Sequence, residues 1–166
     1  ITDSWDVVNE AIDDKHGGFL RDSKYLQIVG EDYIDCVFRI AKEVMPDKDL
    51  FYNDYNEWVP DKKAAIIGAL TRGTAEHGSI IGECLIDGIG MQGYMDLSFP
   101  SIYGSGSFAS ALDRFGKLGL EVQLTELSIS CPDNSPESYE EQAKRYRSVF
   151  TALKMCDTDH GGNVNI

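Results

Sequence analysis

Residues 121–129 read Glu-Val-Gln-Leu-Thr-Glu-Leu-Ser-Ile, an apolar run with the rhythm of a β-strand that is interrupted by Glu126. An unpaired carboxylate is costly to bury, so a glutamate inside such a strand needs an explanation. A strand over 121–127 that ends near this residue would present the carboxylate at the edge of a sheet. Other strands that end at a polar residue would place that residue at the same edge of the sheet.

Strand and helix patterns alternate along the chain. Besides 121–127, short apolar runs predict strands over 4–9, 49–53, 86–92 and 163–166. Apolar residues at helical spacing predict helices over 31–45, 61–77, 107–118 and 136–156. This alternation predicts an α/β fold with a parallel sheet and helices packed outside it. No interdomain linker is seen, so we expect residues 1–166 to form a single domain.

Two architectures fit this order of elements: an open doubly wound sheet and part of a (β/α)8 barrel. The first predicted strand is not followed by Gly-x-Gly-x-x-Gly, the dinucleotide-binding fingerprint. Polar residues gather where the predicted strands end, at Asn9-Glu10, Asn53-Asp54, Gln92 and Thr125-Glu126. A barrel carries its chemistry at that end of its strands, so these positions favour a barrel. About four and a half βα units are present, against the eight of a closed barrel.

The composition is that of a globular chain, with 42% hydrophobic and 26% charged residues. No apolar run is long enough for a membrane span, so no membrane partner is expected. The 15 Lys and Arg residues against 28 Asp and Glu residues give a formal net charge of −13. This charge argues against nucleic acid as a partner, because phosphate binding needs clustered basic side chains.

The cysteines do not indicate a metal site. They have no Cys-x-x-Cys spacing and only three histidines accompany them, which disfavours zinc. The sequence leaves open whether they form disulfides. The four are Cys36, Cys84, Cys131 and Cys156.

Glu10 and Glu126 occupy matching positions, since each follows a short polar residue at the end of a predicted strand. Two carboxylates that face one cleft in different environments are the machinery of glycoside hydrolysis. For either glutamate alone, a strand-end residue that caps a loop or pairs with Lys or Arg is the simpler interpretation. The matched pair favours the catalytic interpretation, in which both carboxylates take part in glycoside hydrolysis.

The sequence motifs around these two glutamates are specific. Residues 5–11, Trp-Asp-Val-Val-Asn-Glu-Ala, resemble the acid/base motif of glycoside hydrolase family 10, the endo-β-1,4-xylanases. Residues 51–56, Phe-Tyr-Asn-Asp-Tyr-Asn, resemble that family's fifth-strand motif, and residues 86–93, Ile-Asp-Gly-Ile-Gly-Met-Gln-Gly, its sixth-strand motif. Residues 124–127, Leu-Thr-Glu-Leu, are similar to its nucleophile motif. The four motifs follow the family order and cover nearly the whole chain.

The resemblance implies a retaining mechanism with two glutamates. Glu10 would be the acid/base and Glu126 the nucleophile, with their carboxyl groups roughly 5 to 5.5 Å apart. Asn9 would bind the sugar 2-hydroxyl, and Tyr55 and Gln92 would line the cleft. No metal or organic cofactor is implied. The substrate would be xylan or a xylo-oligosaccharide.

The chain departs from the family pattern at two positions. Tyr94 follows Gln92-Gly93 where the family has His, and Ser128 lies two residues after Glu126 where the family usually has Asp. In the family these two residues form a hydrogen-bonded pair beside the nucleophile. Because both residues of this pair are changed here, we hypothesise that the Tyr94 hydroxyl contacts Glu126 directly, or that the site is weakened.

The resemblance also covers only part of the family fold. It begins at what would be the fourth barrel strand and ends as the eighth begins, so we expect a partial (β/α)8 TIM barrel with approximately strands 4 to 7, their helices and the start of strand 8. A half barrel has two open sheet edges and an uncovered apolar interior. We therefore expect the chain to need the missing barrel half in the same chain, or self-association.

Other functions compete with a retaining endo-β-1,4-xylanase, which as an isolated half barrel can be inactive. One is a non-catalytic xylan-binding or assembly module that keeps the cleft without turnover. Another is a barrel hydrolase of a different β-glycan. A polymeric substrate is too large to be imported, so the function would imply secretion.

Overall fold

The computed structural model describes residues 2–14, 20–159 and 164–165. Its main sheet is parallel and has the strand order β1 (Ser4–Asn9), β2 (Asp49–Asp54), β3 (Gly88–Met91), β5 (Glu121–Leu124) and β7 (Val164–Asn165). A second, two-stranded parallel sheet joins β4 (Tyr94–Asp96) to β6 (Ser128–Ser130). The helices are α1 (Lys24–Val29), α2 (Tyr33–Val44), α3 (Pro60–Thr71), α4 (Phe108–Gly116) and α5 (Pro136–Asp159).

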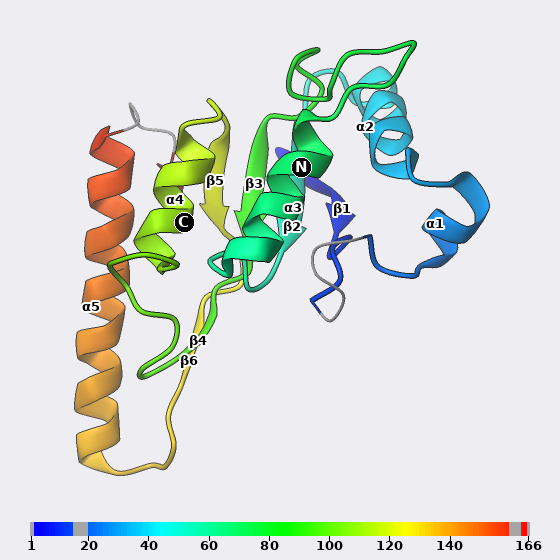
Figure 1. Cartoon of the computed structure of the whole chain (residues 1–166). Coiled ribbons are helices and arrows are strands. Elements are labelled where there is room, and N and C mark those ends of the chain that lie inside the picture. The colour runs from blue at the N-terminus through cyan, green and yellow to red at the C-terminus, as the bar shows by residue number, and fades with distance from the viewer. Residues whose placement is uncertain (1, 15–19, 160–163, 166) are drawn as a thin grey trace.

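The strand order decides between the two predicted architectures. Each new strand of the main sheet is added on the same side of the previous one, whereas a doubly wound sheet reverses direction at a switch point. Right-handed crossovers that always advance in one direction place their helices on one face of the sheet, as in the wall of a barrel. The open doubly wound alternative is therefore wrong, and the fold is a partial barrel (Figure 1).

The parallel register aligns the ends of the strands. Asn9 pairs with Asn53, and Asp54 with Met91, which in turn pairs with Leu124. The residues that follow these strands therefore come out at the same edge of the sheet, as the sequence predicted. This edge carries the candidate site.

Two predicted strands are shorter in the structure than in the sequence analysis. The strands expected over 86–92 and 121–127 end in the main sheet at Met91 and Leu124, and the chain then pairs again as β4 and β6. Gly93 makes the break possible, because its φ is +80° and a Cβ there would lie 2.6 Å from Leu124 Cδ1. Of the predicted strand 163–166, residues 163 and 166 lie outside the described part.

The helices agree with the amphipathic patterns except at one end. α4 begins after Ser107, whose hydroxyl accepts the Ser110 N–H at 3.2 Å as an N-cap. The helix predicted over 61–77 ends instead at Thr71. The Thr74 hydroxyl accepts the N–H groups of Glu76 and His77, which stabilises a turn in place of further helix. The short helix α1 was not predicted.

The outer helices leave apolar side chains uncovered. Figure 1 shows α4 beside α5 at one flank, with α1 and α2 at the other. Ile40 and Val44 of α2 are exposed, as are Phe150 and Met155 of α5. Within the described ranges, no helix has both the length and the apolar character needed to cross a bilayer. The two flanks are thus unfinished surfaces of the partial barrel.

Candidate active site

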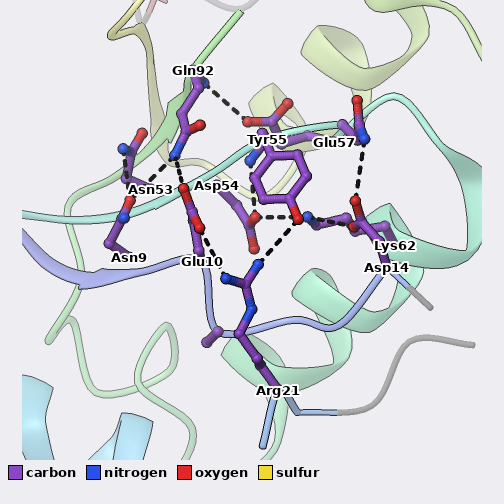
Figure 2. A network of polar contacts seen from close by, with 12 residues as sticks. Asn9, Glu10, Asp14, Arg21, Asn53, Asp54, Tyr55, Glu57, Lys62 and Gln92 are labelled. Atoms are coloured by element: carbon purple, nitrogen blue, oxygen red, sulfur yellow. Dashed lines mark hydrogen bonds and ion pairs between the residues drawn. The ribbon is translucent and has the colours of Figure 1, made fainter. Parts of the chain in front are cut away.

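A chain of amide side chains connects the two predicted carboxylates. Gln92 Nε2 donates to Glu10 Oε1 at 3.0 Å and to Asn9 Oδ1 at 3.4 Å. Asn53 Nδ2 donates to the same Asn9 oxygen at 2.9 Å and to Glu126 Oε1 at 3.1 Å. Figure 2 shows the part of this network around Glu10. The glutamates therefore share one hydrogen-bonded site, built from the ends of four parallel strands.

Glu10 is held as a carboxylate. It follows β1 with a φ of 54°, a left-handed conformation that costs a non-glycine residue about 1 to 2 kcal/mol. Its N–H donates to the Asn53 carbonyl at 2.9 Å, and its Oε2 accepts Arg21 Nη1 at 3.0 Å. The hydrogen bond from Gln92, and then the hydrogen bond and charge of Arg21 with the charge of Lys62, outweigh burial and lower the pKa of Glu10.

Glu126 is exposed at the edge of the sheet, so its carboxylate avoids the burial cost that its sequence position raised. Its N–H donates to the Gln92 carbonyl at 3.0 Å. Tyr94 Oη donates to Glu126 Oε2 at 2.6 Å, which is the contact that the sequence hypothesis required. The hydrogen bond to Glu126 and the charge of that carboxylate raise the pKa of Tyr94.

Tyr94 and Ser128, the two positions that depart from the family pattern, lie opposite each other. Tyr94 on β4 and Ser128 on β6 are register partners in the two-stranded sheet. The paired change thus affects two neighbouring side chains next to the same carboxylate. The contact with Glu126 comes from the β4 side of this pair.

Asn53 is oriented by its neighbours. Thr125 Oγ1 donates to Asn53 Oδ1 at 2.8 Å, which leaves the amide nitrogen for Asn9 and Glu126. A Cβ on Gly90, the register partner of Asn53, would lie 2.4 Å from Asn53 Oδ1. Gly90 therefore provides the space in which this amide turns toward the nucleophile position.

Tyr55 is fixed by cations on one side of the site. Lys62 Nζ lies 3.6 Å from the centre of its ring, and Arg21 Nη2 donates to its hydroxyl at 3.1 Å. Lys62 is buried and pairs with Asp54 and Asp14, each at 2.7 Å. Because the ammonium occupies one face of the ring, a sugar can meet Tyr55 only through the other face or the edge.

Replacing Arg21 with methionine is expected to raise the pKa of Glu10. The change removes a hydrogen bond and a positive charge that stabilise the carboxylate, so Glu10 would stay protonated to higher pH. The midpoint of the Glu10 carboxyl in a ¹³C NMR titration of purified variants should move up in pH. Arg72→Met, at an exposed arginine far from the site, should leave this midpoint in place.

The structure brings five of the six predicted site residues into one chain of hydrogen bonds and connects the sixth through Arg21. The five are Asn9, Glu10, Gln92, Tyr94 and Glu126, and the sixth is Tyr55.

Asn53, Arg21 and Glu57 were not predicted as site residues. Asn53 was noted as a polar strand-end residue without a role, and that position was the usable signal. Arg21 and Glu57, whose Oε1 accepts the Gln92 N–H at 3.0 Å, lie in connecting segments, where no periodicity marks them. Only the folded chain places them beside the predicted residues.

The sequence left the state of the four cysteines open. Cys36, Cys84, Cys131 and Cys156 are all free thiols, and burial raises the pKa of Cys156 to about 11. Over residues 2–14, 20–159 and 164–165, no group of three or more His, Cys, Asp or Glu side chains is placed to hold a metal ion.

Comparison with known proteins gives a consistent result. The model of glycosyl hydrolase family 10 matches residues 1–163. Endo-1,4-beta-xylanase B of Paenibacillus barcinonensis is 37% identical over 157 residues, which are 89% of this chain and 45% of the relative. A putative endo-1,4-beta-xylanase of Caldicellulosiruptor saccharolyticus is 37% identical over 98% of this chain and 52% of its own length.

Solved structures agree with these relatives. A mutant of an intracellular xylanase from Thermoanaerobacterium saccharolyticum, in complex with xylotriose, has a TM-score of 0.80 and 31% identity, and the match covers 98% of this chain and 46% of that one. Another mutant of that xylanase, with xylotetraose, has a TM-score of 0.79. The chain spans about half the length of the curated relatives it matches.

Proposed function

This chain belongs to glycosyl hydrolase family 10, and from that membership we propose that it is the part of a retaining endo-β-1,4-xylanase that supplies both catalytic carboxylates. The hydrogen-bonded chain from Glu10 to Glu126 carries the proposal. Its relatives named endo-1,4-beta-xylanases, and the xylo-oligosaccharides bound in two similar structures, support xylan as the substrate.

In the first step, a Glu126 oxygen would attack the anomeric carbon while Glu10 gives a proton to the departing glycosidic oxygen. The C–O bond to the leaving sugar breaks as a glycosyl ester forms. In the second step, water attacks the same carbon, Glu10 takes its proton, and Glu126 leaves as a carboxylate. Asn9 would bind the sugar beside the nucleophile; the amide groups of Asn53 and Gln92, which donate to its Oδ1, support this role.

The acid role needs a protonated Glu10, whereas the free site stabilises the ionised form. A depressed pKa means that the protonated fraction is lost as pH rises through that pKa, so we expect kcat/KM to be highest on the acidic side. The ionised form suits the second step, in which Glu10 acts as a base.

Tyr94 is proposed to position the nucleophile in place of the family His and Asp. Tyr94→Phe removes the 2.6 Å hydrogen bond to Glu126, and a lost hydrogen bond to a charged group is worth about 1.5 to 3 kcal/mol. We expect kcat to fall roughly 10- to 100-fold with KM little changed. An unchanged kcat in a folded variant would contradict this role.

A matched readout follows the tyrosine itself. Because Glu126 raises the pKa of Tyr94, a Glu126→Gln variant should ionise Tyr94 at lower pH. The difference in tyrosinate absorbance between variants with and without Tyr94→Phe isolates this one phenol. Exposed Tyr139→Phe serves as the control tyrosine.

We also propose that the rest of a barrel, in the same polypeptide, or a second copy of the chain covers the exposed apolar side chains of α2 and α5. Sedimentation of the chain alone should then show self-association that Val44→Lys and Met155→Lys weaken. A chain that stays monomeric and hydrolyses xylan unaided would contradict the proposal.

A non-catalytic xylan-binding module is the second candidate, favoured by the half-length match to the relatives. In that case the chain would retain xylan in a pull-down but release no reducing sugar. Action on another β-glycan is tested by the same assay with that polymer.

Secretion is proposed from the size of the substrate, although one similar structure is an intracellular xylanase. Fractionation of the source cells tests this proposal.

A further inference from the structure

Glu57 is a fully buried carboxyl group in contact with the site. It lies between β2 and α3, its side chain is 0% exposed, and the adjacent Trp58 is buried with it. Its Oε1 accepts the backbone N–H of Gln92 at 3.0 Å. Its Oε2 has no hydrogen-bond partner among the residues that the structure describes.

Among the described residues, no cation pairs with this carboxyl directly. The charged groups that face it are Asp54 and Lys62, and these two pair with each other at 2.7 Å. An isolated carboxylate in such surroundings is costly. Burial is accordingly the main reason that the pKa of Glu57 lies well above its usual range.

The hydrogen bond that Glu57 accepts comes from Gln92, the residue that contacts both Glu10 and Glu126. The Gln92 N–H is shared between Glu57 Oε1 and the Asp54 carbonyl, at 3.0 and 2.9 Å. The Gln92 side chain donates to Glu10, and its carbonyl accepts the Glu126 N–H. A shift of this backbone would therefore reach both catalytic positions.

We propose that Glu57 is a positioning residue, a buried carboxyl that fixes the Gln92 backbone and so directs the Gln92 side chain onto Glu10. The geometry stands on its own, while the consequence for hydrolysis rests on the proposed acid/base role of Glu10. Because Gln92 is the largest influence that lowers the pKa of Glu10, displacing it should raise that pKa. The other groups that act on Glu10 are Arg21 and Lys62, which the substitutions leave in place.

Two substitutions separate the hydrogen bond from the volume of the side chain. Glu57→Gln keeps an oxygen for the Gln92 N–H, whereas Glu57→Met has similar length without a strong acceptor. Glu57→Asp, one methylene shorter, is the second test of reach if the methionine variant does not fold. Thermal unfolding establishes which variants are folded.

The test follows the side-chain carboxyl carbons of the whole 166-residue chain by ¹³C NMR across pH, with Glu10 assigned from Glu10→Gln. Glu57→Gln should leave the Glu10 midpoint as in the unmodified chain, and Glu57→Met should raise it and shift the Gln92 side-chain amide signals. A folded methionine or aspartate variant with an unchanged Glu10 midpoint would overturn the inference.

Hydrolysis is measured separately so that the two proposals can fail independently. In an active chain, Glu57→Met should lower kcat by on the order of 10- to 100-fold with the basic limb moved upward, and Glu57→Gln should retain the unmodified profile. No turnover even when the missing barrel half or a second copy is present, together with a Glu10 midpoint that still moves in the chain, would contradict the xylanase proposal and support the role of Glu57.

Discussion

Glu126→Ala is expected to abolish xylan hydrolysis, with kcat reduced by at least about 10⁴-fold. The physical reason is that no other group then forms the glycosyl ester, and removal of a nucleophile from a cooperating set costs on the order of 10⁶ in kcat in a well-studied hydrolase. Since Glu126 is exposed at the sheet edge, the alanine variant should fold normally. Release of reducing sugar from xylan is the measurement.

Glu140→Ala is the matched control, because Glu140 is an exposed glutamate on α5, an outer helix of the partial barrel. It should hydrolyse xylan at the unmodified rate. Equal activity of the Glu126→Ala variant and the unmodified chain would remove the catalytic assignment. Binding of xylan without turnover in both would favour the non-catalytic module.

Glu10→Ala is expected to lower kcat on xylan by about 10²- to 10⁴-fold, the usual contribution of a positioned acid/base. The loss should depend on the leaving group. A sugar hydroxyl needs a proton to depart, whereas an acidic phenol does not. Aryl xylobiosides with acidic phenols should therefore still form the glycosyl ester in the Glu10→Ala variant.

The comparison of the two substrates is the control for Glu10. If Glu10 only supported the fold or the position of Arg21, xylan and the activated aryl glycoside would lose activity in parallel. A parallel loss would contradict the acid/base role. Arg21→Met, which keeps Glu10 but removes its cation, should instead move the pH profile and preserve hydrolysis of xylan.

Much of the fold was predictable from the sequence because short strands and amphipathic helices carry strong periodic signals. The strand over 4–9 is observed with the predicted bounds, and the parallel order of strands follows from the alternation with helices. The failures have local causes. Gly93, with its positive φ, separates β3 from β4, and the Thr74 turn replaces the last part of a predicted helix.

The site was predictable where strand ends mark it and unpredictable where only folding brings residues together. Glu10 and Glu126 follow strands, so sequence position alone indicated a shared edge. The partner of Glu10 is Arg21, in a connecting segment, and Glu57 reaches Gln92 across 35 positions of sequence. Glu126 carries no burial cost in spite of its apolar neighbours in sequence, because its carboxylate is exposed and accepts hydrogen bonds from Tyr94 and Asn53.

The most direct test of the two-glutamate account is covalent trapping. A xylobioside with fluorine at C2 and a good leaving group should form the glycosyl ester but release it slowly, because the fluorine destabilises the positive charge of the second transition state. Mass spectrometry of the digested protein should then find one xylobiosyl adduct, on the peptide that contains Glu126, and none in Glu126→Ala. An adduct on a different residue, or xylan hydrolysis with inversion and no adduct, would contradict the account.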